Sequence, residues 1–254
     1  MRIVVTNCNT TQEMTEEIVR GARAAAGPGT TVTGLTPAWG PESVEGWLDS
    51  YLSAAAVIDT LRTYDGAYDA VVMAGFGEHG REGVRELVDV PVVDITEAAA
   101  HLACLLGRRY GVVTTLERSR GQIEDSLHAA GVAQNCAVVV GTGLGVLDLG
   151  DTQRTEEAFV AAAVQARDAG AEVLVLGCAG MTGLQRLVGD KLGLPVVDGV
   201  AAAVKLAESL VNLGLTTSRA GSYAKPLPKR RTWRPGAKPG PGAGPGPGSP
   251  GPGV

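Results

Sequence analysis

An imperfect internal duplication constrains the fold of this chain more than any other feature of its sequence. Residues 70–101 read AVVMAGFGEHGREGVRELVDVPVVDITEAAAH, and residues 172–203 read EVLVLGCAGMTGLQRLVGDKLGLPVVDGVAAA. Each copy contains an apolar run, a turn of small residues, a short amphipathic stretch, Pro-Val-Val-Asp and an Ala-rich segment. A duplicated α/β unit typically builds two facing lobes with a cleft between them. The copies align Gly75 with Cys178. At this position one lobe therefore has a thiol facing the cleft, whereas the other has a glycine without a side chain.

Short apolar runs alternate with helix-length segments through the rest of the chain, and a weaker match pairs residues 2–10 with residues 110–119. Strands that read as continuous apolar runs, separated by helices, indicate parallel sheets covered on both faces. We therefore predict an α/β fold of two pseudo-symmetric lobes, each a mostly parallel sheet flanked by helices, with the active site in the cleft between them. The predicted strands lie at 3–7, 31–36, 70–74, 92–95, 110–115, 136–140, 173–177 and 195–198.

The predicted helices include one around 43–63 and a last one at about 199–213, which we expect to pack back on the first lobe. The N-terminal lobe is then predicted to comprise residues 1–99 and 210–225, and the C-terminal lobe residues 100–209. The remaining residues, 226–254, are rich in Pro and Gly without a strict Gly-X-Y period. Such a segment cannot bury apolar area, so it is predicted to be a disordered tail.

Composition argues against several classes of partner. The formal net charge of −5 disfavours a nucleic-acid or anionic-membrane partner. The four cysteines show no CxxC spacing and the three histidines no metal-site spacing, which favours a reducing compartment and no bound metal. The sequence shows no signal peptide and no apolar stretch near the roughly 18 residues that a membrane helix needs. We expect a cytoplasmic protein that acts on a small molecule.

Ligands of parallel α/β folds bind at the carboxyl ends of the strands. This rule gives four candidate binding segments directly after predicted strands, at 7–10, 75–80, 114–119 and 178–182. The duplication makes them two facing pairs. The loops at 37–47 and 141–150 are expected to set the preference for the side chain of the substrate.

Residues 75–80 read GFGEHG, a literal GxGxxG after a strand, and Asp94 ends the next strand. That pattern is typical of a dinucleotide site. However, the intervening helix is short, and Asp94 lies 14 residues past Gly80 rather than about 20. The matching copy, GCAGMTG, departs from the pattern altogether. We therefore predict no nucleotide cofactor.

Cys178 is the strongest candidate for a catalytic side chain. Most cysteines are buried structural thiols, and Cys104 and Cys136 fit that description. Cys178 instead follows a strand in a glycine-rich turn, where a helix starting near Met181 would present free N–H groups. Such groups stabilise a thiolate and lower the pKa of the thiol.

The other strand ends carry weaker candidates. Cys8 lies between Asn7 and Asn9, whose amides can orient a carbonyl group, although turn-forming roles are equally open to them. Thr114 and Thr115 are hydrogen-bond donors at the equivalent end of the second lobe. His79 lies in the turn that lacks a thiol, where a solvated loop position is expected by default.

Taken together, these strings resemble the hydantoin and allantoin racemases of the aspartate/glutamate racemase superfamily. The resemblance covers about residues 1–228 and is carried by RIVVTNCNTT, GPESVEG, AGFGEHG, VVTTLERS, LGCAGM, PVVDGVAAA and TSRAGSYAKP. It implies a cofactor-free homo-oligomer that acts on a stereocentre beside a carbonyl. One cysteine from each lobe flanks that carbon; one takes its proton as a thiolate, and the other returns a proton to the opposite face. A thiol pKa of about 8.5 can be tuned for such exchange near neutrality.

On this resemblance, Cys178 is the acid/base, Gly75 marks the position of the missing first cysteine, and His79 and Cys8 are lesser catalytic candidates. The substrate is expected to be a small cyclic ureide, a 5-substituted hydantoin or allantoin, or an amino-acid derivative. The residues expected to hold it are Asn7, Asn9, Phe76, Gly77, Thr114, Thr115, Ala179 and Gly180. Donors among them would stabilise the enolate.

Three positions depart from the family pattern. Gly75 replaces the first cysteine, Glu78-His79 replaces the usual Asp-Pro, and Cys8 replaces the Pro of Asn-Pro-Asn. Because glycine carries no proton, three alternatives stay open. His79 or Cys8 supplies the second base; or one cysteine suffices, as in the arylmalonate decarboxylases of this superfamily, although the rest of their motif is lacking; or the protein binds a small carbonyl compound without turnover.

Overall fold

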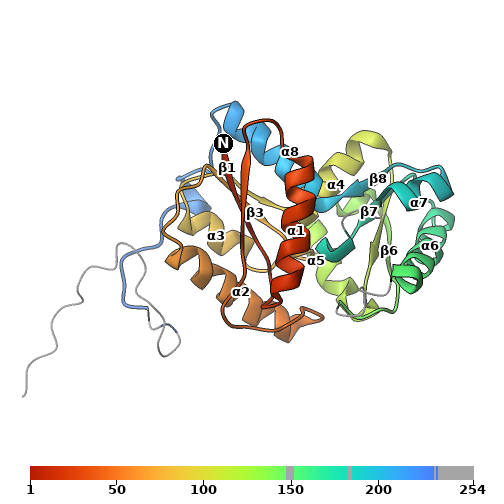
Figure 1. Cartoon of the computed structure of the whole chain (residues 1–254), viewed down its shortest axis with the longest axis horizontal. Helices are drawn as coiled ribbons and strands as arrows, with labels where there is room; N and C mark the ends of the chain where they lie inside the picture. The colour runs from red at the N-terminus through yellow and green to blue at the C-terminus, as the bar shows by residue number, and fades with distance from the viewer. Residues whose placement is uncertain (147–151, 182–184, 232, 234–254) are drawn as a thin grey trace, which may run out of the picture.

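The computed structural model describes residues 1–146, 152–181, 185–231 and 233, in which one order of elements runs twice (Figure 1). The first half comprises β1 (Arg2–Thr6), α1 (Gln12–Ala25), β2 (Thr31–Leu35), α2 (Trp47–Thr63), β3 (Ala70–Met73), α3 (Arg81–Leu87), β4 (Val92–Asp94) and α4 (Ile95–Leu106). The second half comprises β5 (Tyr110–Thr114), α5 (Arg120–Ala129), β6 (Cys136–Gly141), α6 (Thr152–Asp168), β7 (Val173–Leu176), α7 (Gln185–Leu192), β8 (Val196–Asp198) and α8 (Gly199–Asn212). Short 3₁₀ turns lie at Glu117–Ser119, Ala133–Asn135, Ala179–Met181 and Gly221–Tyr223.

The two halves contain equivalent sheets. Their strand orders are β2-β1-β3-β4 and β6-β5-β7-β8, and each of these pairings is parallel. Strands β3, β5 and β7 are buried along their whole length, which explains why they read as continuous apolar runs. The predicted α/β fold with two parallel sheets is confirmed.

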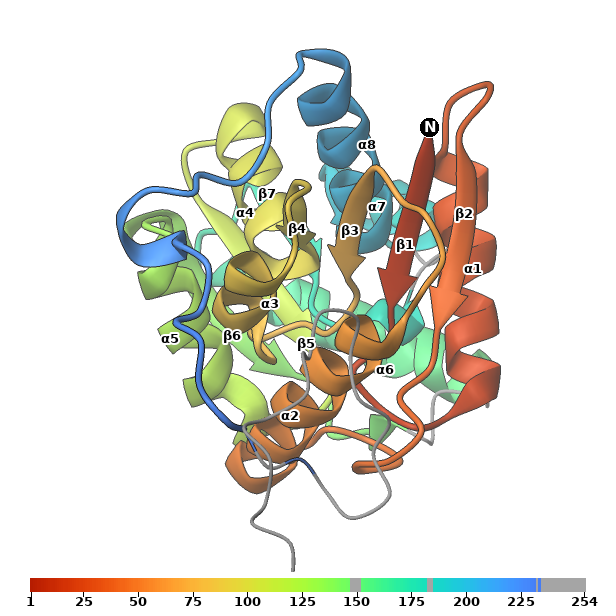
Figure 2. The same cartoon turned by 90° about the vertical axis from the view of Figure 1, so that its left-hand side faces the viewer.

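Helices cover both faces of the first sheet, which Figure 2 shows. Apolar side chains of α2 and α3 pack on one face, and those of α1 and α8 pack on the other. The helix that follows each half's last strand crosses to the opposite sheet: α4 packs on β7, whereas α8 packs on β3, as predicted for the last helix. At the crossing, a Cβ on Gly199 would lie 3.0 Å from the Ile95 carbonyl oxygen, so the two helices begin in close contact. This contact joins the apolar cores of the two halves.

The repeated Pro-Val-Val-Asp motif ends the outer strand of each half and caps the crossing helix. Asp94 accepts hydrogen bonds from the N–H groups of Thr96 and Glu97 at 2.8 and 3.2 Å. Asp198 does the same for Val200 and Ala201 at 2.8 and 3.0 Å. Each carboxylate satisfies amides that a helix start leaves without partners. Asp94 is fully buried in this role, which does not suit the ribose contact of a dinucleotide site.

Two predicted segments differ from the structure or lie outside its description. The helix expected from residue 43 begins at Trp47, because Glu45 reaches the second half and its Oε1 accepts a hydrogen bond from the Val146 N–H at 3.3 Å. The predicted tail lies outside the described residues from position 234 onward, so its disorder stays a prediction.

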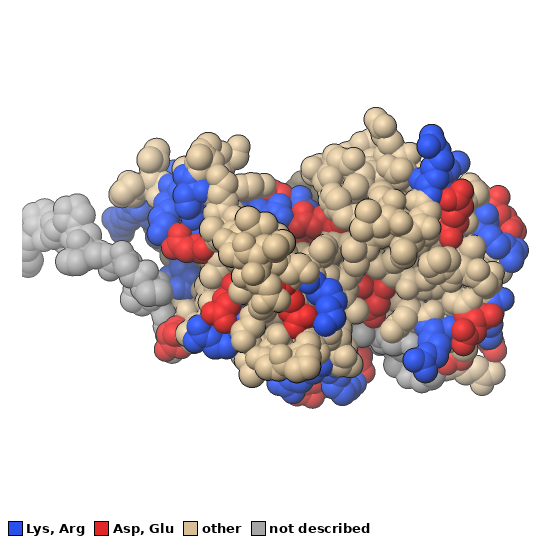
Figure 3. Space-filling model, turned by 90° about the horizontal axis from the view of Figure 1, so that it is seen from above, with Lys and Arg blue, Asp and Glu red and all other residues tan. Residues whose placement is uncertain are grey.

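The charged surface is mixed. On the face drawn in Figure 3, basic and acidic side chains are interspersed. No helix within the described ranges combines the length and the apolar character needed to cross a membrane.

Candidate active site in the cleft between the halves

The carboxyl ends of β1, β3, β5 and β7 open onto one cavity between the two halves. It has an empty volume of about 510 Å³, part of which is open solvent. The sequence-predicted residues that line it are Asn7, Cys8, Asn9, Gly75, Phe76, His79, Thr114, Thr115, Cys178 and Ala179. Two turns of each half therefore meet here, as the strand-end rule predicts.

Some of the other lining residues lie in segments that the sequence analysis predicted to be near the substrate, and some do not. Val44, Ser119 and Val146 belong to loops or strand ends that were expected near the substrate. Met14, Ile18 and Gln122 were missed, because they lie on helices α1 and α5. The spacing of these residues along the sequence shows only that they lie on the inward face of a helix. It does not distinguish residues of the hydrophobic core from residues that line a cavity.

The Asn7-Cys8-Asn9 turn is held by its own amides. Asn7 Oδ1 accepts from the Cys8 N–H at 2.7 Å, and Asn7 Nδ2 donates to Asn9 Oδ1 at 2.8 Å and to Thr15 Oγ1 at 3.1 Å. The Asn7 side chain is thus used to shape the turn. Asn9 Nδ2 donates to Met14 Sδ at 3.0 Å, and a primary amide carries a second N–H that can face a ligand.

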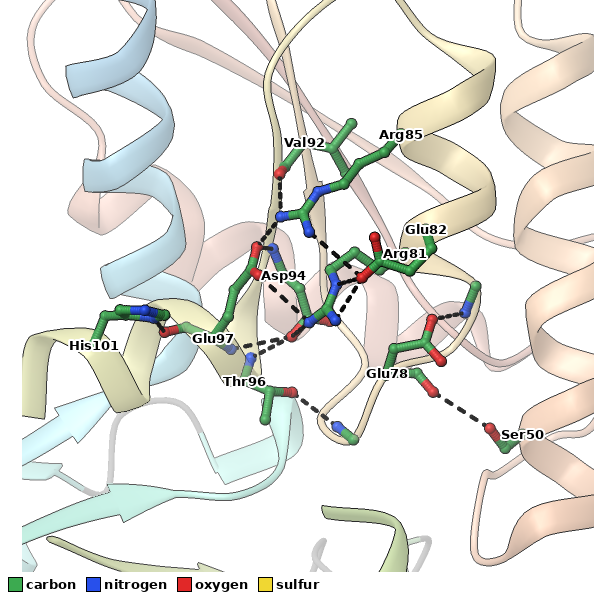
Figure 4. Close-up of polar contacts among 12 residues, drawn as sticks. Ser50, Glu78, Arg81, Glu82, Arg85, Val92, Asp94, Thr96, Glu97 and His101 are labelled. Atoms are coloured by element: carbon green, nitrogen blue, oxygen red, sulfur yellow. Dashed lines mark hydrogen bonds and ion pairs between the residues drawn. The ribbon is translucent and has the colours of Figure 1, made fainter. Parts of the chain in front are cut away.

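The turn after β3 has an unusual backbone. Gly77, Glu78 and Gly80 all have positive φ, at 119°, 66° and 92°. Glycine adopts such values without strain, whereas Glu78 needs support. Its Oε1 accepts from the Gly80 N–H at 2.8 Å, and Ser50 Oγ donates to its carbonyl at 3.4 Å (Figure 4).

Gly77 is also tied down within the first half. Its N–H donates to Thr96 Oγ1 at 2.8 Å, which Figure 4 shows. This amide, predicted to bind substrate, therefore already has a partner. The backbone of the turn is therefore held at both ends, and Gly75, Phe76 and His79 are its residues that line the cavity.

The space beside Gly75 is crowded. A Cβ on Gly75 would collide with Cδ2 of His79, and it would lie 2.7 Å from Cys8 Cβ and 3.1 Å from Cys8 Sγ. His79 and Cys8 therefore fill the space beside Gly75. The three positions that the sequence analysis expects to differ from the family pattern thus pack against one another.

Gly75→Ala is accordingly expected to destabilise the fold by about 1–3 kcal/mol, the usual cost of overpacking. Gly121→Ala is the matched control, since a Cβ there meets nothing within 4 Å and the residue lies in helix α5. The control should gain up to about 1 kcal/mol, because alanine favours the helix. Urea unfolding of both variants measures the difference. Equal stability of the two would contradict the crowding.

His79 is buried, and its expected position in a solvated loop is wrong. It is 4% exposed, its Nδ1 lies 3.0 Å from Ser50 Oγ and 3.4 Å from Gln122 Nε2, and its ring also bonds the Phe76 backbone. Burial lowers the pKa of His79 to about 4. The imidazole is therefore neutral near pH 7 and a weak base. The sequence missed this because Ser50 and Gln122 come from helices far away in the chain.

The lowered pKa of His79 makes stability depend on pH. The unfolded chain binds the proton near pH 6.5 and the folded chain only near pH 4, so this contribution is complete above about 6.5 and is lost as pH falls towards 4. Relative to His79→Gln, the natural protein should lose about 3 kcal/mol across that window. His128→Gln changes an exposed histidine and should keep the natural profile. Urea unfolding between pH 4 and 7 gives the comparison, and parallel curves for the natural protein and His79→Gln would refute it.

The two cavity thiols act on each other electrostatically. Burial, followed by the charge on Cys178, raises the pKa of Cys8 to about 12. Cys178 is half-buried at the end of β7 and begins the turn in which the Met181 N–H donates to its carbonyl at 3.1 Å. The helix expected from about Met181 begins at Gln185 within the described residues. Gly180 lies in the intervening 3₁₀ turn.

The second half offers hydroxyl donors at the end of β5. Thr114 Oγ1 donates to the Gly177 carbonyl at 3.1 Å, which ties β5 to the turn that carries Cys178. Thr115 is 4% exposed and lines the cavity, and its backbone carbonyl accepts a hydrogen bond from Thr142 Oγ1 at 3.1 Å. Its own hydroxyl is a hydrogen-bond donor. Thr115 is therefore the hydroxyl best placed to meet a substrate.

The described residues hold no group of three His, Cys, Asp or Glu side chains that could bind a metal ion. The side chains that line the cavity include two thiols together with amide and hydroxyl donors. A thiolate removes a proton from carbon, and the donors stabilise the negative charge that develops on a carbonyl oxygen.

Comparisons with known proteins agree with this site. Residues 3–207 match the family described as Asp/Glu/hydantoin racemase. The chain belongs to this family. It is 37% identical over 234 residues to a hydantoin racemase of Paenarthrobacter aurescens, covering 91% of this chain and 99% of that protein. The structure of an allantoin racemase from Pseudomonas fluorescens is 54% identical, with a TM-score of 0.90 over 92% of this chain and all of that chain.

The decarboxylase likeness extends to the fold alone. A structure of arylmalonate decarboxylase has a TM-score of 0.57 and 17% identity, covering 88% of this chain and 97% of that chain. Racemase relatives thus share both sequence and fold with this member of the racemase family, and they support racemase-type isomerase activity.

Proposed function

We propose that this member of the Asp/Glu/hydantoin racemase family is a cofactor-independent racemase or epimerase. Its substrate is a small cyclic ureide, either a 5-substituted hydantoin or allantoin, or an amino-acid derivative. The observation that carries the proposal is the convergence of the Cys178 thiol and the strand-end turns of both halves on one cavity. The hydantoin and allantoin racemases among its relatives support the choice of substrate class.

In the proposed reaction, the Cys178 thiolate takes the proton from the carbon beside the carbonyl. The C–H electron pair moves into the carbonyl as an enolate, and the sulfur becomes a thiol. The Thr115 hydroxyl and the second N–H of Asn9 are donors for the enolate oxygen. Such preorganised donors commonly contribute the largest part of the stabilisation of a developing charge.

The cavity also has apolar lining residues that suit the substituent of the ring. They are Met14, Ile18, Val44 and Val146. Val44 and Val146 come from opposite halves, and Glu45 links their loops through its hydrogen bond to the Val146 N–H. We therefore assign the preference for the substituent to these side chains, in keeping with the loops named from the sequence.

Deuterium incorporation tests the function directly. The protein is incubated in deuterated water with each enantiomer of allantoin and of 5-benzylhydantoin, beside enzyme-free blanks for spontaneous exchange. We expect loss of optical rotation together with one deuterium at the stereocentre, well above the blanks. Absence of both from all four compounds refutes the proposed function.

The same assay separates the alternatives. Gly75 favours a single-thiol decarboxylase, which would release carbon dioxide from phenylmalonate and leave the optical rotation of the hydantoins unchanged. A binding protein would be stabilised thermally by one of these compounds without exchanging its proton. Either pattern replaces the racemase proposal.

A further inference from the structure

We propose that Cys8 is the second catalytic acid/base of this site, standing on the first-half wall in place of the thiol that position 75 lacks. This inference rests on the proposed racemase function and names the residue that serves the second face of the substrate. Racemisation needs a proton to leave one face of a carbon and another to arrive on the opposite face. Cys178 of the second half can serve only one of them.

The position of the sulfur is the first argument. Cys8 Sγ lies 3.1 Å from the point where the Cβ of a side chain at position 75 would stand. The thiol of Cys8 thus fills the space into which a cysteine at 75 would project. It lines the same cavity as Cys178 but comes from the other half of the molecule.

The surroundings of Cys8 are those of a held functional group rather than of a core side chain. Its N–H donates to Asn7 Oδ1 at 2.7 Å, and its carbonyl accepts from the buried Ser53 hydroxyl of α2. Its backbone is therefore fixed on both sides. Within the described residues, Cys104 and Cys136, which lie outside the cavity, pack against the main apolar cluster, whereas Cys8 belongs to none of the clusters.

An independent observation points to a ligand between the two thiols. Thr115 lines the cavity and is 4% exposed. Its hydroxyl can donate a hydrogen bond to the carbonyl of a substrate. The cavity then holds a thiol on each wall and a hydroxyl donor at the end of β5.

His79, the other candidate, does not suit the role. Its ring is engaged by Ser50, Gln122 and the Phe76 backbone, and burial lowers its pKa to about 4. A base that weak cannot easily remove a proton from carbon. Its ring packs beside Gly75 instead, where it closes the space next to Cys8.

The electrostatic coupling of the thiols fits a shared proton task. Burial and the charge on Cys178 raise the pKa of Cys8, so Cys8 holds its proton while Cys178 is a thiolate. When Cys178 takes the substrate proton, its charge is neutralised and one cause of the raised pKa is gone. Cys8 then gives up its proton more easily. Such a pair titrates as a unit rather than as two separate groups.

The protons and electrons of the chemical step balance, and solvent then removes a proton from Cys178 and returns one to Cys8 before the next turnover of the same enantiomer. The C–H bond breaks, its proton goes to Cys178 Sγ, and the electron pair enters the carbonyl as an enolate. The S–H bond of Cys8 then breaks, its proton forms a new C–H bond on the opposite face, and Cys8 is left as the thiolate. For the mirror-image substrate the roles of the two sulfurs are exchanged.

Enantiomer-specific exchange tests the assignment. Cys8→Ala, Cys8→Ser, Cys178→Ala and the natural protein are each incubated in deuterated water with the separate enantiomers of whichever compound the natural protein racemises. We expect Cys8→Ala to lose racemisation by about 100-fold or more, the lower range for general acid–base catalysis. It should still exchange the proton of one enantiomer with retention, and Cys178→Ala should exchange only that of the opposite enantiomer. Complementary one-sided exchange is a signature that a purely structural role for Cys8 does not produce.

The outcomes separate this inference from the proposed function. If the natural protein racemises and Cys8→Ala does so within a few-fold, Cys8 is not the second base and the function stands. If a folded Cys8 variant exchanges neither enantiomer, or both, the assignment also fails. If the natural protein exchanges nothing, the function itself fails. Cys8→Ser keeps a side chain of similar shape, so it replaces Cys8→Ala in the assay if the alanine variant is unstable. Cys136→Ala is the control, because this cysteine lies outside the cavity.

Discussion

Replacing Cys178 with alanine is expected to lower the rate of racemisation by about 10³-fold, in the middle of the range for general acid–base groups. The loss should be equal in both directions, because in the proposed mechanism each turnover passes a proton through the sulfur of Cys178 whichever enantiomer is the substrate. It should fall on kcat rather than KM, since the thiol acts on the proton and contributes little to binding. Polarimetry with each enantiomer as the starting material measures both constants.

Cys104→Ala is the matched control for this prediction. The same sulfur is removed, but from helix α4, where the side chain packs against the apolar core and not in the cavity. This variant should retain full activity and lose only packing energy, as a truncated core side chain does. A Cys178→Ala protein with activity near that of Cys104→Ala would remove Cys178 from the mechanism.

The duplication let the sequence predict the architecture and the place of the site. Because the two copies repeat the same strand-turn-helix pattern, the positions after β3 and β7 had to be equivalent, and the structure brings the ends of β1, β3, β5 and β7 to one cavity. Local rules suffice for such predictions, since strands need apolar runs and parallel strands bring their carboxyl ends to one edge.

The sequence could not predict how the turns pack on each other. The burial of His79 depends on Ser50 and Gln122, which are 29 and 43 residues away in the chain. The contact of Cys8 with the empty side of Gly75 likewise joins turns after two different strands. The start of α2 at Trp47 depends on Glu45 reaching Val146. Each of these is a long-range contact that no local propensity encodes.

Arg81→Leu is expected to destabilise the fold by about 3–5 kcal/mol, the usual cost of removing one partner of a buried ion pair. Arg81 follows the turn after β3 and is 2% exposed. Its guanidinium lies 3.4 Å from Glu97 Oε2 and 3.9 Å from the fully buried Asp94, as Figure 4 shows. Leucine has a similar apolar stem but no charge, so the carboxylate of Asp94 would be left buried without a cation.

The pH dependence of this loss distinguishes lost charge from lost packing. Burial, followed by the charge on Glu97, raises the pKa of Asp94 to about 7, so its ionisation costs stability as pH rises from about 4 towards 7. Without Arg81 that pKa rises further, and the destabilisation of Arg81→Leu should therefore grow with pH and shrink in acid. A loss of equal size at pH 5 and pH 8 would assign it to packing.

Arg120→Leu supplies the surface comparison. Arg120 is also paired, with its Nε 2.8 Å from Glu124 Oε1, but both side chains are more than 40% exposed. Solvent screens such a pair, so its loss should cost about 0.5 kcal/mol or less. Adding Asp94→Asn to Arg81→Leu should restore part of the lost stability, because asparagine has no charge that is left buried without a cation. The same addition to Arg120→Leu should restore none, since Asp94 still has Arg81 beside it there. Recovery confined to the Arg81 background would identify the buried cation, rather than arginine bulk, as the source of the stability that Arg81 contributes.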